Sequence, residues 1–322
     1  MRRAGLAAVL SATAAVLIPQ GAPAKQTEPA PAVAAAPAPT VSGVTVTGEK
    51  PDPLVDKTTE FVRRRLPTSQ NEQYARFHDP VCVKVLGLPA EFDAFVAKRI
   101  LEIAREVGAS VDTSGGCQPN VDVIFSAQPQ AQLSDIAKRR DVLFGFYFRA
   151  QAKKIATFSR PIQSWYLTRS VGTEGADMLE LYDPAPCQTS STGPPCDLKA
   201  PAVKGRAGSR LGNDMSSELV HSLIIADSGK VSGEPIGAVA DYIAVLALSR
   251  WRGLETCSGL PTILNLMADG CGAEDRPEAA TGGDLALLKG LYKVDPREAG
   301  TMQRSAIASY LRKAHQGDGS SH

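Results

Sequence analysis

The 322-residue sequence lacks the short motifs that identify the commonest catalytic sites. It has no G-x-G-x-x-G and no P-loop, so neither of these nucleotide-binding patterns is present. It has no G-x-S-x-G, because Gly208–Gly212 places its serine second rather than third. H-E-x-x-H and C-x-x-C are also missing, which removes the usual zinc signatures. No motif assigns a reaction, and we expect no cofactor.

The sequence also has few histidines, and its positive and negative charges nearly balance. Of four histidines, His315 and His322 lie near the C-terminus, and His78 lies in a polar segment before the first expected strand, which leaves His221 as the candidate. The 35 basic and 34 acidic residues give a net charge of +1, and no long basic run occurs. We therefore expect no binding to nucleic acid or to an anionic membrane surface.

The N-terminus has the pattern of an exported protein. Met1–Arg3 is positively charged, Ala4–Ile18 is apolar, and Ala22–Ala24 fits the small-x-small cleavage rule. We expect a signal peptide over residues 1–24, with a retained membrane anchor as the alternative. The Pro/Ala-rich residues 25–50 then form a disordered tether. The mature chain is expected to be periplasmic or secreted and to carry no transmembrane span.

All six cysteines lie beyond the tether, and an even number in an exported chain indicates disulfides. Six cysteines allow fifteen connectivities. Proximity along the chain favours Cys82–Cys117, Cys187–Cys196 and Cys257–Cys271. Zinc binding is the alternative, but the spacings fit no zinc pattern, and we expect no metal site.

Residues 51–315 are expected to form a single globular domain, followed by a disordered tail at 316–322. The fold class is α+β, with an N-terminal α/β sheet layer, a buried central helix and a helical C-terminal part. Hydrophobic periodicity places an apolar helix face on Phe92, Phe95, Val96, Ile100, Ile103 and Val107. Expected strands are 81–86, 120–125, 161–168, 178–182 and 221–226. Expected helices start at Pro89 and Pro235, and others span 129–139, 261–268, 284–292 and 297–313.

Two segments carry specific expectations. Pro235 opens a helix that is apolar almost all round, so this helix must lie inside the fold and the other elements must pack around it. Asp141–Phe158 is ambiguous between helix and strand. Its aromatic cluster, Leu143–Phe148, is expected to belong to the core rather than to a ligand platform.

Glu218 and His221 form one E-x-x-H pair, which would face the same way on a helix. A di-metal bundle needs two such pairs, and this chain has one. On a strand, Glu218 would point away from His221, because side chains alternate between faces. We expect His221 to be a hydrogen-bonded residue at a strand end, with a metal-ligand role as the alternative.

Asp241 is the only charged residue between Pro235 and Arg250. A buried carboxylate needs a partner, because an isolated buried charge is costly. We expect a structural role in which Asp241 binds a loop backbone or an arginine, for example Arg160 or Arg169. A catalytic or ligand-binding role is the alternative.

Two segments carry a resemblance. PIQSWYLT at Pro161–Thr168 and ADYIAVLALSRW at Ala240–Trp251 resemble segments of uncharacterised exported proteins from alphaproteobacteria. The order of elements also resembles that of zinc-peptidase-like folds. Where such a fold has H-E-x-x-H, Ala240–Ala244 reads A-D-Y-I-A, without the two histidine ligands and the general base. The resemblance implies an inactive relative.

The sequence therefore favours an exported, non-catalytic binding or envelope-interaction protein, whose partner is an unknown envelope protein or a small ligand. The alternative is a hydrolase with a degenerate or unrecognised peptidase-like site around Glu218, His221 and Asp241.

Overall fold

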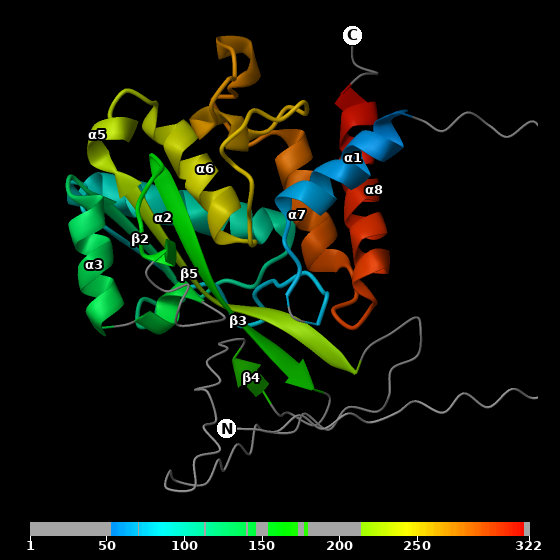
Figure 1. Ribbon diagram of the computed structural model, residues 1–322, viewed down its shortest axis with the longest axis horizontal. Helices are drawn as coiled ribbons and strands as arrows, with labels where there is room; N and C mark the ends of the chain where they lie inside the picture. Colours follow the sequence, from blue (N-terminus) through cyan, green and yellow to red (C-terminus); the bar gives the residue numbers. More distant parts are fainter. Residues whose placement is uncertain are drawn as a thin grey trace, which may run out of the picture. The chain divides into compact units, whose positions relative to one another are not determined.

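A mixed β-sheet runs through the fold (Figure 1). We analysed it in a computed structural model, which describes residues 53–69, 71–112, 114–139, 141–145, 154–172, 177–179 and 214–318. The sheet has five strands in the order β1-β2-β5-β3-β4. Their bounds are β1 Val83–Leu86, β2 Val121–Ser126, β3 Ile162–Gly172, β4 Asp177–Leu179 and β5 Met215–Asp227.

The first half of the sheet is parallel and the second half antiparallel. β1 pairs with β2, and β2 with β5, in parallel. Between β1 and β2 the chain crosses over through α2 (Ala90–Val107). This helix is followed by Gly108 in the left-handed conformation that glycine adopts readily. β3 pairs antiparallel with both β5 and β4.

Helices cover both faces of the sheet. Tyr166 of β3 and Ser222 of β5 donate hydrogen bonds to carbonyls of α6 (Ile236–Ala247), so α6 lies on their face. The main core joins this face to α2, α6 and the C-terminal helices. On the opposite face, α3 (Pro129–Arg139) and a 3₁₀ turn, η1 (Asp141–Phe144), pack around Trp165, Leu223 and Ile225.

A second group of helices lies beside α6. α1 (Pro53–Arg65) and α7 (Gly282–Lys293) both pack against α8 (Gly300–Asp318), and Figure 1 shows the three together. Short helices complete the fold: α5 (Ser228–Val231), η2 (Ile263–Met267) and η3 (Ala273–Asp275).

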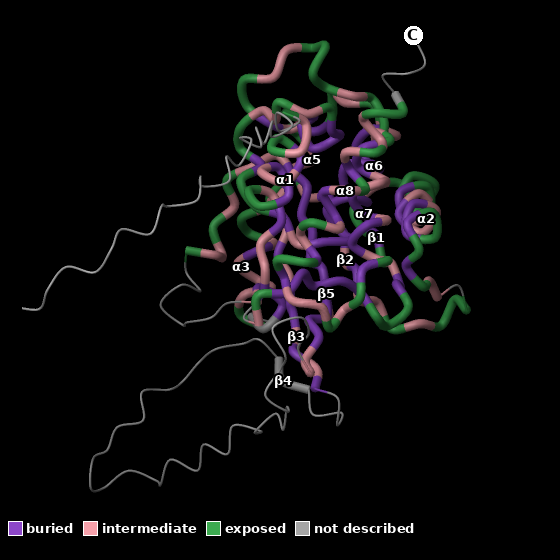
Figure 2. Tube along the Cα trace, turned by 90° about the vertical axis from the view of Figure 1, so that its right-hand side faces the viewer, coloured by how far each residue is buried: buried purple, intermediate pink, exposed green. Residues whose placement is uncertain are grey.

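The α+β class is confirmed, including the early sheet layer, the buried central helix and the helical C-terminal part. Every residue of α6 from Ala238 to Ala247 is buried, and Figure 2 shows α6 and β5 in the buried colour along most of their length. This burial follows from the sequence of α6, because a helix without a polar face has to be enclosed by other elements.

Several boundaries differ from expectation. β5 begins six residues before the predicted strand, because its polar start is buried by cross-strand partners rather than by apolar contacts. The helix expected over residues 261–268 is the shorter 3₁₀ turn η2, Ile263–Met267, instead of an α-helix. Phe92 and Phe95, expected on the buried face of α2, remain 40% and 43% exposed. Helix α1 was not predicted at all.

The ambiguous aromatic segment is resolved only at its start. Leu143 and Phe144 are buried, and the Phe144 ring lies 5.7 Å from that of Trp165, so this part of the cluster belongs to the core. Residues 146–153 lie outside the described residues, as do the N-terminal residues 1–52 and the C-terminal residues 319–322.

Two of the three predicted disulfides are present: Cys82–Cys117 and Cys257–Cys271. The third predicted pair, Cys187–Cys196, lies outside the described residues. Among the residues that are described, no helix is long and apolar enough to cross a membrane.

We expect the purified mature protein to contain no free thiol. Thiol titration in denaturant, without reductant, tests all six cysteines at once, because unfolding exposes every thiol to the reagent. The same titration after reduction is the positive control. Two reactive thiols before reduction would exclude the third bridge.

Candidate functional site

Asp241 forms a structural ion pair between helices. Its side chain is 3% exposed, and its carboxylate accepts two hydrogen bonds from Arg99 of α2, one of them at 2.9 Å. It also accepts the backbone N–H of Ala280, at 2.8 Å, from the segment before α7. The expected kinds of partner, an arginine and a loop backbone, are both present. The suggested arginines were wrong, because the partner is Arg99 rather than Arg160 or Arg169.

Glu218 is also held by arginine. Nε of Arg169 on β3 donates to Glu218 at 2.7 Å, and Nη2 lies 2.6 Å from the same oxygen. The other carboxylate oxygen lies 3.4 Å from Nδ1 of His78. Burial lowers the pKa of His78, so the neutral imidazole is favoured beside this carboxylate.

His221 pairs with a neighbouring strand. Its Nε2 lies 3.2 Å from the Asp122 carboxylate of β2, while its buried Nδ1 has no hydrogen-bond partner among the residues that the structure describes. The side chain is only 7% exposed. It is therefore a buried strand residue with one satisfied nitrogen.

A β-bulge changes the expected relation between Glu218 and His221. The β3–β5 register shifts so that Leu167 pairs with His221 while Thr168 pairs with Leu219, which leaves Val220 as the extra residue. Such an extra residue offsets the alternation of side chains beyond it. Glu218 and His221 thus share the face of their partners Arg169 and Leu167, whereas strict alternation predicted opposite faces.

The three predicted site residues do not meet at one centre. The side chain of Ser222 points to the face that carries α6, so that of the preceding His221 points to the other face. Asp241, on α6, binds α2 and the start of α7. Within the described part of the chain, no group of three His, Cys, Asp or Glu residues is arranged to hold a metal ion.

A pocket of about 590 Å³ lies between α1 and the loop 253–260. Helix α1 contributes one face, with residues three and four positions apart, as helical geometry requires. The loop contributes Gly253 and the run from Thr256 to Leu260. Phe61 and Leu260 supply apolar surface. The helix face consists of Lys57, Glu60, Phe61, Arg64 and Arg65.

The charge on this pocket is mainly positive. Glu60 is held by Arg63 and Arg64, which lower its pKa to about 2, so it stays ionised and neutralises part of their charge. Arg65 donates to the carbonyl of Thr256 at 2.8 Å, and among the described residues no carboxylate forms an ion pair with it. Burial, with the nearby charge of Arg64, lowers the pKa of Arg65. Within the described part of the chain, Arg65 is thus a half-buried cation without an anionic partner.

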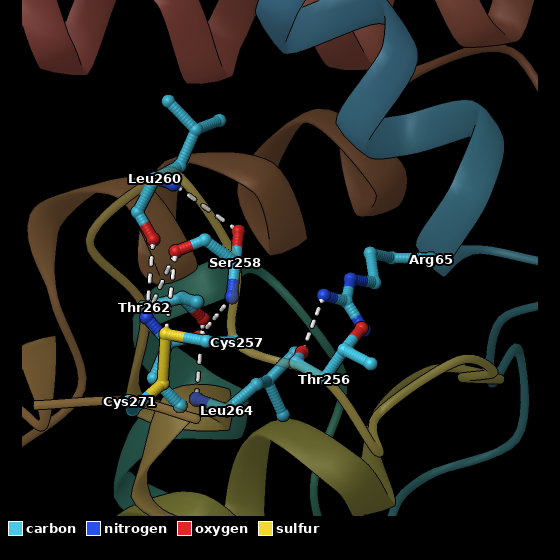
Figure 3. Close-up of a disulfide and its surroundings, with 9 residues drawn as sticks. Arg65, Thr256, Cys257, Ser258, Leu260, Thr262, Leu264 and Cys271 are labelled. Atoms are coloured by element: carbon cyan, nitrogen blue, oxygen red, sulfur yellow. Dashed lines mark hydrogen bonds between the residues drawn. A yellow bond between two sulfur atoms is a disulfide. The ribbon is translucent and has the colours of Figure 1, made fainter. Parts of the chain in front are cut away.

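The loop opposite Arg65 is fixed in shape (Figure 3). The Cys257–Cys271 disulfide closes it, and Cys257 N–H donates to the Asp269 carbonyl at 3.0 Å. The buried side chain of Asn265 accepts the N–H of Ser258 at 2.8 Å. The pocket wall is therefore already organised before any ligand arrives.

Arg252 fixes the helix side of the pocket. Its guanidinium donates to the carbonyls of Arg63 and Arg64 at 2.7 and 3.0 Å, and its backbone N–H donates to the carbonyl of Arg65. The last carbonyls of a helix have no partner within the helix, and here an arginine supplies it.

Sequence reasoning missed this pocket because it missed α1. The signal was present: Pro53 stands at a favoured first helical position, and Leu54, Thr58, Phe61 and Val62 follow helical spacing. The surrounding polar residues and the preceding Pro/Ala-rich stretch obscured it. Comparison with protein-family models, curated proteins and solved structures finds no match.

Proposed function

We propose that the protein is an exported, non-catalytic binding protein, and that the pocket between α1 and the loop 253–260 is its binding site. The observation that carries the proposal is Arg65, a half-buried cation that has no carboxylate partner among the described residues and lies beside the apolar Phe61 and Leu260. Arginine at such a position suits a carboxylate, which it can bind through two parallel hydrogen bonds.

The expected ligand is an acidic, partly apolar segment of an envelope protein. Its carboxylate would meet Arg65, and its apolar side chain would pack on Phe61 and Leu260. The two disulfides support export, because such bonds persist in oxidising compartments.

Binding is tested with fluorescein-labelled peptides. A peptide of alternating glutamate and leucine is expected to bind, and one of alternating lysine and leucine is not. Arg65→Ala should weaken binding of the acidic peptide at least about tenfold, as for an interface arginine that loses an ionic hydrogen bond. Fluorescence polarisation gives the affinities, and melting curves check that the variant is folded.

Arg139→Ala is the matched control. Arg139 is an exposed arginine on α3, paired with Asp135, and its loss should leave peptide affinity unchanged. Equal affinity for both peptides, or undiminished binding by a folded Arg65→Ala protein, would contradict the proposal.

A hydrolase is the second candidate, and one observation favours it. The His221–Asp122 hydrogen bond resembles the base–carboxylate pair of hydrolytic sites, and Nδ1 of His221 has no partner. An esterase and peptidase screen tests it. Turnover by the wild type that is abolished in His221→Gln and retained in Arg65→Ala would replace the binding proposal with this one.

A further inference from the structure

A second cavity, of about 660 Å³, lies where three distant segments meet. The segment before β1 supplies Arg76–His78, the turn after α2 supplies Gly108–Ser110, and the end of α7 with the following loop supplies Tyr292–Pro296. None of these residues was singled out by the sequence except His78.

Arg76 is the unusual member of this cavity. It is only 5% exposed, and its Nη2 donates to the Val294 carbonyl at 2.6 Å. Its Nη1 is buried without a partner, and among the described residues no carboxylate lies within ion-pair distance of it. Burial lowers the pKa of this guanidinium. A buried, charged donor without an acceptor is costly, which makes it a candidate for ligand binding.

The other charges near the cavity leave a positive balance. Lys293 and Asp295 line it together with Arg76, so one negative charge faces two positive ones. Asp295 already accepts the N–H of Arg297 at 2.8 Å. Glu218, which lies near Arg76 and His78, is occupied by Arg169.

The cavity wall is held in place by a buried glutamine. Gln303 of α8 is fully buried; its Nε2 donates to the carbonyls of Asp295 and Pro296, and its Oε1 accepts the N–H of Tyr74. On the other side, the Arg76 carbonyl accepts the N–H of Leu219 at 2.8 Å. Arg76 and the loop that faces it are thus fixed from both sides before a ligand binds.

We propose that this cavity binds a small oxyanion, a carboxylate or phosphate group, through the guanidinium of Arg76. The guanidinium of Arg76 supplies the positive charge that pairs with the anion, and the exposed Lys293 adds to that charge. This site is separate from the pocket beside α1, and it does not depend on the function proposed for that pocket.

The test measures melting temperature in inorganic phosphate and in succinate, at an ionic strength held constant with sodium chloride. The oxyanion that the cavity binds should raise the melting temperature by about 4 °C at roughly twenty times its Kd, and the other should raise it less at the same concentration. The two arms separate a phosphate ligand from a carboxylate ligand. Arg76→Met should lower the affinity at least about tenfold, because it removes a charge-assisted hydrogen bond.

A second variant guards against loss of folding, since Arg76 is buried. Ser110 is an exposed residue of the cavity lining, and Ser110→Asp adds a negative charge there without removing a buried contact. Ser110→Asp should abolish the rise in melting temperature that the oxyanion causes. Ser232→Asp, at an exposed position after α5, should leave this rise unchanged. The proposal is overturned if neither oxyanion stabilises the wild type above chloride, or if Ser110→Asp responds as the wild type does.

Discussion

Replacing Asp241 by alanine is expected to destabilise the protein by about 2–4 kcal/mol. The substitution removes the acceptor for the Arg99 guanidinium and for the Ala280 N–H, and so α6 loses these polar contacts with α2 and with the segment before α7. Arg99 is 35% exposed, so water can solvate part of its released charge, which keeps the loss within this range.

Asp241→Asn should cost less than Asp241→Ala. Its amide oxygen can still accept the Ala280 N–H, but it no longer neutralises Arg99. Arg99→Ala is expected to be costly too, because it leaves a buried carboxylate with one backbone donor. The double variant Asp241→Ala/Arg99→Ala should lose less free energy of unfolding than the two single alanine variants together, with a coupling energy of about 1–3 kcal/mol.

Urea denaturation of the wild type and the four variants measures these free energies. Asp135→Ala is the matched control, because Asp135 forms a more exposed ion pair with Arg139, and such pairs contribute up to about 1 kcal/mol. If Asp241→Ala were as stable as the wild type, the structural role would be wrong, and Asp241 would become the first residue to test for ligand binding.

Loss of the Cys82–Cys117 bridge is expected to cost about 4 kcal/mol, and loss of Cys257–Cys271 about 3 kcal/mol. The two bridges span 35 and 14 residues of sequence, and the longer loop gains more entropy when it is released in the unfolded state. Cys82 is also only 3% exposed at the start of β1, so its replacement removes buried contacts.

The double variants Cys82→Ala/Cys117→Ala and Cys257→Ala/Cys271→Ala are compared with the wild type by urea denaturation without reductant. A larger m-value in the variants would show that the unfolded chain has expanded, as the entropic explanation requires. The predicted Cys187–Cys196 pair closes the shortest loop, so its loss should cost least. A larger loss for Cys257–Cys271 than for Cys82–Cys117 would contradict the explanation by loop length.

The Cys257–Cys271 variant has a second use, because its bridge closes the wall opposite Arg65. If that wall must be organised in advance, the variant binds the acidic peptide more weakly than the wild type even where it remains folded. The response to phosphate or succinate at Arg76 should be unaffected, since no residue of this loop lines that cavity.

The sequence alone was sufficient to predict the features that depend on the pattern of neighbouring residues. The all-round apolar character of residues 236–247 required a buried helix, and periodicity located α2, α3, β1 and β2 to within a few residues. Two disulfides followed from proximity along the chain. The need of Asp241 for a partner followed from the cost of a bare buried charge.

Only the tertiary structure decided which groups meet. Arg99 and Asp241 are 142 residues apart in sequence, and many other arginines were equally plausible partners before the helices were packed. The bulge at Val220 inverted the expected relation of Glu218 and His221, because one extra residue offsets an alternation with a period of two. The Arg65 and Arg76 pockets are lined by segments distant in sequence, so neither pocket could be recognised before the chain was folded.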